Sequence, residues 1–209
     1  MELNGKKINF LGDSITEGVG ATPMTNGYVY QFAAMTGAEI RNYGIGGTRF
    51  SRQTTPSENP RWDKDFCSRV AEMDPDADII VVFGGTNDFG HGDAPLGEMT
   101  DRTVWSFYGA CHVLFTSLIE KYPDKPIVVM TPMHRGIELT HRIGLKPYVN
   151  AIREVAEFYA LPVLDLFATS GIQPLIPVQK ELYFKDEVHP NDAGHARIAY
   201  KLKRFLENM

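Results

Sequence analysis

The stretch INFLGDSITEG, residues 8–18, sets a short strand-like run directly before a glycine, an acid and a serine. The run, residues 8–11, is typical of a buried β-strand and ends at Gly12. Two interpretations fit the next residues: a simple turn in which Asp13 or Ser14 caps a helix, and a bend that presents Ser14 as a nucleophile. The stretch by itself favours the turn, because a short motif is weak evidence without its structural context.

Further strand-like runs alternate with segments of helical periodicity. The runs cover residues 39–43, 79–83, 127–130 and 163–166. Helices are predicted over 28–35, 104–118 and 148–159, and from Pro190 onward, since proline fits the first helical turn. Continuous apolar strands are typical of a parallel sheet buried on both faces. We therefore expect an α/β protein, a flavodoxin-like three-layer αβα sandwich with a five-stranded parallel sheet in the order 2-1-3-4-5.

The composition excludes several classes of protein. The 209 residues contain no obvious linker, repeat or low-complexity tract, so one domain over 1–209 is expected; the most loop-like segments are 51–65, 89–101 and 168–185. A net charge of −5 disfavours nucleic-acid binding. No apolar run is long enough to span a membrane, and the first residues lack a signal-peptide pattern. We expect a cytoplasmic protein, with a leader lost by trimming left open, and homo-oligomerisation is also open.

Polar residues gather where the predicted strands end, which is where open α/β sheets bind ligands. These segments are GDS (12–14), NYGIGGT (42–48), GGTND (84–88) and TPMHR (131–135), and DEVHP (186–190) precedes the last helix. Each has an ordinary explanation as well. Glycines form turns, Asn87-Asp88 suits an Asx turn or a cap, and Asp186 suits a helix start. Their joint position at one sheet edge favours a site over independent turns.

These residue types fit a serine hydrolase, which needs a nucleophile, a base, a group that orients the base and donors for an oxyanion. Ser14 supplies a hydroxyl and His189 an imidazole. Asp186 lies three residues before His189, so one local turn brings its carboxylate to the far ring nitrogen. The oxyanion donors expected are the Ser14 backbone N–H, a glycine within 44–47 and the Asn87 side-chain amide.

Taken together and in order, the blocks resemble the GDSL, or SGNH, hydrolase family over residues 12–195. The first block is matched by GDSI (12–15), with isoleucine in place of leucine, the third by GTND (85–88), and the last by DEVHP (186–190). The second block is less clear, because Gly44, Gly46 and Gly47 compete for one position. Asn42 and the spacing favour Gly47.

The resemblance implies hydrolysis of esters or thioesters through an acyl-enzyme on a flavodoxin-like αβα sandwich. Ser14 would attack the ester, His189 would relay the proton and Asp186 would orient His189. Gly47, Asn87 and the Ser14 amide would hold the oxyanion. The resemblance implies no cofactor and no metal, and the histidines show no close zinc-binding spacing.

The candidate rim of the site is polar and cationic. It comprises Arg49, Arg52, Arg61, Trp62, His91, Asp93, His134, Arg135, His141 and Arg142. Candidate substrate contacts among them are Arg49, Trp62, His91, His134 and Arg135. His91 and His134 follow the third and fourth strands, which makes them candidates to face a substrate, although the pattern favours a role away from the substrate for each.

The rim favours a small-molecule ester, with short acyl groups such as acetyl, and a carbohydrate as one candidate carrier. Leu175, Ile176 and Pro177 offer an apolar wall that suits a lipid or a partner subunit, so a lysophospholipase or thioesterase with the same triad is the alternative. A non-catalytic ligand-binding protein on this scaffold is a further alternative, which the complete set of catalytic residue types disfavours. A flavin binder is disfavoured because the first loop lacks a Ser/Thr run for a phosphate.

Overall fold

The computed structural model describes residues 1–138 and 144–209, so the rim candidates His141 and Arg142 lie outside the described residues. Within that part of the chain, five strands form one sheet in which every neighbouring pair is parallel. They are β1 (Lys7–Gly12), β2 (Glu39–Gly44), β3 (Ile79–Phe83), β4 (Ile127–Met130) and β5 (Val163–Leu164). The order is β2-β1-β3-β4-β5, which confirms the predicted fold class and strand order.

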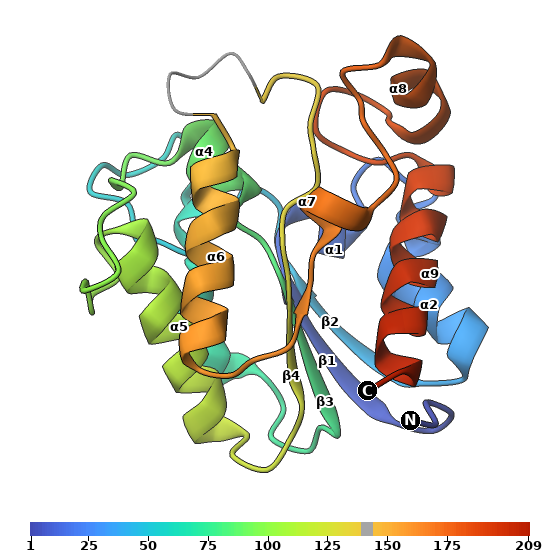
Figure 1. Cartoon of the computed structure of the whole chain (residues 1–209), viewed down its shortest axis with the longest axis horizontal. Coiled ribbons are helices and arrows are strands. Elements are labelled where there is room, and N and C mark those ends of the chain that lie inside the picture. The colour runs from blue at the N-terminus through green and yellow to red at the C-terminus, as the bar shows by residue number, and fades with distance from the viewer. Residues whose placement is uncertain (139–143) are drawn as a thin grey trace.

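The longer helices cover both faces of the sheet (Figure 1). They are α2 (Tyr28–Thr36) and α9 (Asp192–Glu207) on one face, and α5 (Phe107–Lys121) and α6 (Lys146–Phe158) on the other. Because successive strand residues point to opposite faces, β3 divides its side chains between two apolar cores. Ile80 and Val82 join the core under α5 and α6, whereas Val81 joins the core under α2 and α9.

Shorter helices fill the connections. They are α1 (Ser14–Glu17), α3 (Phe66–Arg69), α4 (Thr86–His91), α7 (Leu166–Thr169) and α8 (Pro177–Tyr183), with 3₁₀ turns at Met24–Asn26, Pro60–Asp63 and Val70–Glu72. The carboxyl ends of the strands share one edge of the sheet, and α1, α4 and α7 begin there (Figure 1). No helix in the described ranges has the length and apolar character needed to span a membrane.

Several predicted boundaries are wrong, and side-chain caps explain three of them. The helix predicted from residue 104 begins at Phe107, because the Ser106 side chain caps it. The fifth strand ends at Leu164, because the Asp165 carboxylate accepts the Ala168 N–H at 3.1 Å and starts α7. The last helix begins at Asp192 rather than at Pro190, because the Asn191 side chain caps it. Pro190 instead pairs with Phe184 in an isolated antiparallel bridge.

The predicted loop over 168–185 contains a helix, α8, which begins with Pro177. None of its residues is buried, so its sequence carries no apolar stripe facing a core. The proline at its first position is therefore the sequence signal for this helix.

Candidate active site

Ser14 is delivered to the sheet edge by the sharp turn from β1 into α1. The Asp13 carboxylate accepts the Ile15 N–H at 3.0 Å and caps α1, so Ser14 is the first residue of the helix. The turn is tight enough that a β-carbon at Gly12 would lie 1.9 Å from Thr16 Oγ1. Asp13 therefore caps α1, and the same turn places the Ser14 hydroxyl at the edge of the sheet.

Three side chains from opposite ends of the sequence form a continuous hydrogen-bond chain at this edge. His189 Nε2 lies 2.9 Å from Ser14 Oγ, and His189 Nδ1 lies 2.8 Å from Asp186 Oδ2. The other Asp186 oxygen accepts the backbone N–H groups of Val188 and His189, each at 2.7 Å. The 186–189 loop thus wraps around its own carboxylate, which fixes the imidazole against Ser14.

The charge on Asp186 determines the hydrogen position on the imidazole. Burial opposes ionisation of this carboxyl, but hydrogen bonds from the His189 backbone and ring and from Val188 outweigh it, so the pKa of Asp186 lies below its ordinary value. An ionised carboxylate only accepts, so Nδ1 of neutral His189 carries the hydrogen. Nε2 is then free to accept the proton of the Ser14 hydroxyl.

The three candidate oxyanion glycines differ in what their N–H groups bind. Gly44 donates to Asn42 Oδ1 at 2.8 Å, and Gly46 donates to Glu17 Oε2 at 2.7 Å. The Gly47 N–H makes no hydrogen bond to any residue that the structure describes. Gly47 also has a left-handed backbone, with φ of +78°, a conformation that glycine adopts without strain.

Helix α4 holds the segment 44–51, called the glycine loop below, in place from its first turn. The buried Asn87 donates one amide hydrogen to Thr48 O at 2.9 Å, and its second amide hydrogen has no partner among the described residues. The next residue, Asp88, accepts the backbone N–H groups of Phe50 and Ser51 at 3.0 and 2.9 Å. Burial raises the pKa of Asp88 to about 6 despite these hydrogen bonds.

Arg69 is a structural residue of the site that sequence reasoning missed. Its buried guanidinium donates to Gly12 O at 3.1 Å, Tyr43 O at 2.7 Å and Thr48 Oγ1 at 3.0 Å. It therefore ties the ends of β1 and β2 to the glycine loop. Burial lowers the pKa of Arg69 to about 10, which leaves it charged at neutral pH. The available sequence signal was an arginine within the largely apolar segment 66–73.

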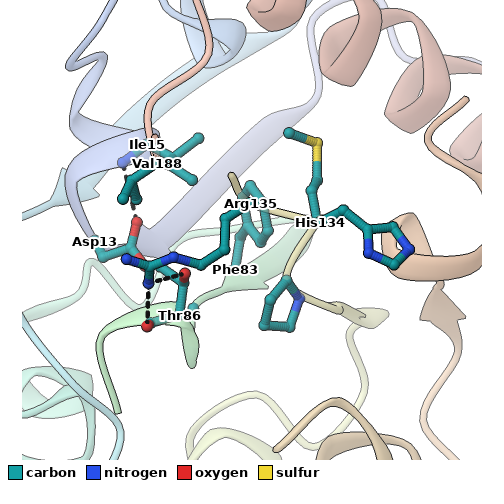
Figure 2. Close-up of a pocket in the computed structure, with 10 residues that line it drawn as sticks. Asp13, Ile15, Phe83, Thr86, His134, Arg135 and Val188 are labelled. Atoms are coloured by element: carbon teal, nitrogen blue, oxygen red, sulfur yellow. Dashed lines mark hydrogen bonds between the residues drawn. The ribbon is translucent and has the colours of Figure 1, made fainter. Parts of the chain in front are cut away.

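Arg135 is buried rather than exposed at the rim, and its side chain lies beside Asp13 and Thr86 (Figure 2). Its guanidinium donates to Thr86 O at 3.0 Å and Thr86 Oγ1 at 3.1 Å, and its Nε has no partner in the described chain. It lines a small cavity together with Asp13 and Val188. Burial raises the pKa of the Asp13 carboxyl to about 6.

The other predicted substrate contacts form two separate groups. Trp62 packs on Gly47, and its ring centroid lies 5.1 Å from that of His91. Arg49 is buried behind them, bound to Asp63 at 3.0 Å and to His91. His134 lies apart from this group, in a hydrogen bond of 2.7 Å to Glu138 and against the Phe167 ring at 3.8 Å.

Comparison with known proteins gives a consistent result. The sequence model of the GDSL-like lipase/acylhydrolase family matches residues 10–197. The fold matches a solved Lactobacillus plantarum protein with 32% identity and a TM-score of 0.84, covering 99% of this chain and 98% of that one. It also matches the lipase/acylhydrolase from Enterococcus faecalis with 20% identity and a TM-score of 0.68, covering 97% and 96% of the two chains. A member of the lipolytic G-D-S-L family from Veillonella parvula matches with 19% identity and a TM-score of 0.68, covering 97% and 99%. No curated protein sequence matches the chain.

Proposed function

Because the chain belongs to the GDSL-like lipase/acylhydrolase family, it is an ester-hydrolysing serine hydrolase, and we propose that Ser14, His189 and Asp186 carry out the hydrolysis. The observation that carries this proposal is the unbroken chain from Ser14 Oγ to His189 Nε2, at 2.9 Å, and from His189 Nδ1 to Asp186, at 2.8 Å. Both distances are within the range at which a hydroxyl, an imidazole and a carboxylate exchange or share hydrogens.

In the first half of the reaction, Ser14 Oγ attacks the ester carbonyl while His189 Nε2 takes its proton. Asp186 stabilises the imidazolium that forms and keeps the ring oriented. Collapse of the tetrahedral intermediate breaks the ester C–O bond, and His189 returns the proton to the departing alcohol. A water molecule then attacks the acyl group on Ser14 by the same steps and releases the acid.

The negative charge that develops on the carbonyl oxygen is held by the N–H groups of Ser14 and Gly47 and by the Asn87 amide. Support for Gly47 comes from elimination, because the N–H groups of Gly44 and Gly46 are bound to side chains. The Ser14 N–H, like that of Gly47, makes no hydrogen bond to a described residue. Donors already in place around the oxyanion lower the barrier without reorganising.

The preferred substrate of this proposal is an ester of a small acyl group such as acetyl, with a carbohydrate as a candidate carrier. Support for this preference comes from the polar surroundings of the proposed catalytic residues, where Asn87 contacts Thr48, and where Trp62 and His91 lie beside Gly47. Polar surroundings of this kind favour a short acyl group over a long acyl chain.

One observation favours a lysophospholipase or thioesterase as the second candidate. Four apolar side chains in and before α8, Leu175, Ile176, Val178 and Leu182, are between 41% and 67% exposed. Exposed apolar side chains that cluster in this way can contact lipid.

Hydrolysis of p-nitrophenyl esters from acetate to decanoate tests the proposal and separates the two candidates. We expect kcat/KM to be highest for acetate and to fall with acyl length. Ser14→Ala should lose turnover, whereas Ser117→Ala, a serine on α5, should retain it. Highest activity on decanoate would favour the second candidate, and turnover retained by Ser14→Ala would overturn the proposed mechanism.

A further inference from the structure

We propose that Trp62 and His91 bind the alcohol part of the ester through two neutral N–H donors and select a neutral, hydroxyl-rich alcohol such as a sugar. This inference rests on the proposed function, because it takes Ser14 as the nucleophile and Gly47 as an oxyanion donor. It adds a recognition site to that function and defines the chemical class of the leaving group.

The position of His91 follows from the geometry of α4. Asn87 and His91 are four residues apart, so their side chains lie on the same face of the helix. The glycine loop runs along that face, since Asn87 holds Thr48 O at 2.9 Å and Arg49 Nη1 reaches His91 Nδ1 at 3.2 Å. His91 is therefore one helical turn beyond the proposed oxyanion donor.

Trp62 reaches the same place from the 3₁₀ turn Pro60–Asp63. Its indole packs so closely on Gly47 that an added β-carbon there would lie 2.1 Å from Trp62 Cδ1. The preceding glycine lies beside the nucleophile, because a β-carbon at Gly46 would be in van der Waals contact with Ser14 Cβ at 3.5 Å. Trp62 and His91 thus border the reacting centre on the side of the glycine loop.

Arg49 determines which nitrogen of His91 carries the hydrogen. A guanidinium only donates, so His91 Nδ1 accepts from Arg49 Nη1 and the hydrogen of the neutral ring is on Nε2. Partial burial of the ring and the nearby Arg49 charge lower the pKa of His91 to about 4, so the ring stays neutral near pH 7. His91 thereby presents a fixed, uncharged N–H donor.

Both donors are available to a ligand. His91 Nε2 and Trp62 Nε1 make no hydrogen bond to any residue in the described ranges. His91 is exposed and Trp62 is half-buried, so each retains access to solvent. The oxygen of a hydroxyl group accepts from such donors, and the indole adds an apolar surface beside them.

Two arginines beside this pair are already ion-paired, which disfavours a charged alcohol. Arg49 pairs with Asp63 at 3.0 Å, and Arg61 pairs with Glu17. A phosphate or a quaternary ammonium on the leaving group would have to compete with these ion pairs. A polyhydroxylated neutral group needs only the two N–H donors.

A pair of acetate esters of similar size tests the inference: a monoacetylated methyl glucoside, and cyclohexyl acetate, which lacks the hydroxyls. We expect the wild-type enzyme to favour the glucoside in kcat/KM. Trp62→Phe and His91→Phe each remove one donor but keep a ring, and each should lower the ratio of the two kcat/KM values by about tenfold, as expected for one uncharged hydrogen bond. His91→Gln restores an N–H donor and should recover part of the ratio.

The control is Trp105→Phe, which changes an exposed tryptophan on another loop and should leave the ratio at its wild-type value. A ratio unchanged in both donor variants, or equal proportional losses on both esters, would overturn the inference. The p-nitrophenyl acetate assay with Ser14→Ala distinguishes the two proposals. If turnover depends on Ser14 but the ratio of the two kcat/KM values is the same in the wild type and both donor variants, the proposed function stands and the recognition site is refuted.

Discussion

The tautomer of His189 depends on one carboxylate, so Asp186→Asn should be severe although it changes one atom. The asparagine oxygen would keep the backbone N–H groups of Val188 and His189, and its NH₂ group would face Nδ1. The ring would then carry its hydrogen on Nε2, where it cannot accept the Ser14 proton. We expect kcat for p-nitrophenyl acetate to fall by about 10⁴, as for the equivalent change in another serine hydrolase.

The exposed Asp124→Asn provides the matched control and should retain wild-type kcat. Circular dichroism on each variant checks that the fold is kept. A loss smaller than tenfold in Asp186→Asn would mean that another group orients the imidazole.

The kinetics of an Asn87 variant distinguish stabilisation of the transition state from substrate binding. If its free amide hydrogen contacts the oxyanion, Asn87→Ala should lower kcat by about 10²–10³ and change KM much less. The lost hydrogen bond to Thr48 O also loosens the glycine loop, so the melting temperature is measured beside the kinetics. A raised KM with kcat unchanged would contradict the oxyanion assignment.

Residues in short local motifs could be identified from sequence, whereas those that act through distant backbone could not. Ser14 follows the end of an apolar run, and Asp186 and His189 lie three residues apart before the last helix. The structure places the three side chains in hydrogen-bond contact. Arg69 was missed because its partners are carbonyls and a hydroxyl from three separate segments. Arg49 looked like a rim cation, but packing of the 51–65 segment buries it.

At the scale of elements, the helices and strands predicted most clearly from sequence are those whose side chains are buried. The apolar runs of β1, β3 and β4 were found because a buried strand needs them on both faces. Helix α8 was missed because it buries no residue and therefore has no periodic apolar pattern. The end of β5 and the start of α9 depend on caps by Asp165 and Asn191, which compete locally with the strand and proline signals.

Arg69 joins three elements, so its removal should reveal how they are held together. Arg69→Met would leave the carbonyls of Gly12 and Tyr43 without this donor, and we expect a loss of about 3 kcal/mol in the free energy of unfolding. For a chain of this length that corresponds to a fall of roughly 6–12 °C in melting temperature. Arg204→Met on α9 is the exposed control, and equal melting temperatures for the two variants would argue against this role.

At the scale of the whole molecule, two segments that the sequence separates by more than 170 residues meet at one sheet edge. Parallel connections explain this, because each crossover returns the chain to the same end of the sheet. The shared edge was therefore predictable from the parallel strands. The contact of α1 with residues 186–189 was not, because β3 and β4 separate β1 from β5 and the contact depends on packing of loops that carry no periodic signal. That residues 1–209 form one domain stays a prediction.

Folding also shifts the pKa values of ionisable groups, and these shifts affect stability with opposite signs. Burial raises the pKa of Asp13 and Asp88 from 3.8 to about 6, so the folded chain binds more protons between these values and both groups destabilise it as pH rises. The pKa values of His91, His112 and His195 are lowered, with burial as the largest cause. The unfolded chain therefore binds more protons at these histidines below about pH 6.5, and they make the fold more stable as pH rises.

Asp13→Asn removes one of these opposing groups while keeping the cap, because the asparagine oxygen still accepts the Ile15 N–H. At pH 4 Asp13 is largely protonated in the folded chain, so variant and wild type should have similar free energies of unfolding. As pH rises to 7, the wild type must keep a buried carboxylate ionised, and the variant should become more stable by about 3 kcal/mol. Urea unfolding at pH 4, 5, 6 and 7 measures this difference, with Asp124→Asn as the exposed control. If the difference in the free energy of unfolding between variant and wild type stays constant from pH 4 to 7, the prediction is wrong. That result would show that the pKa of the Asp13 carboxyl is the same in the folded and unfolded chains.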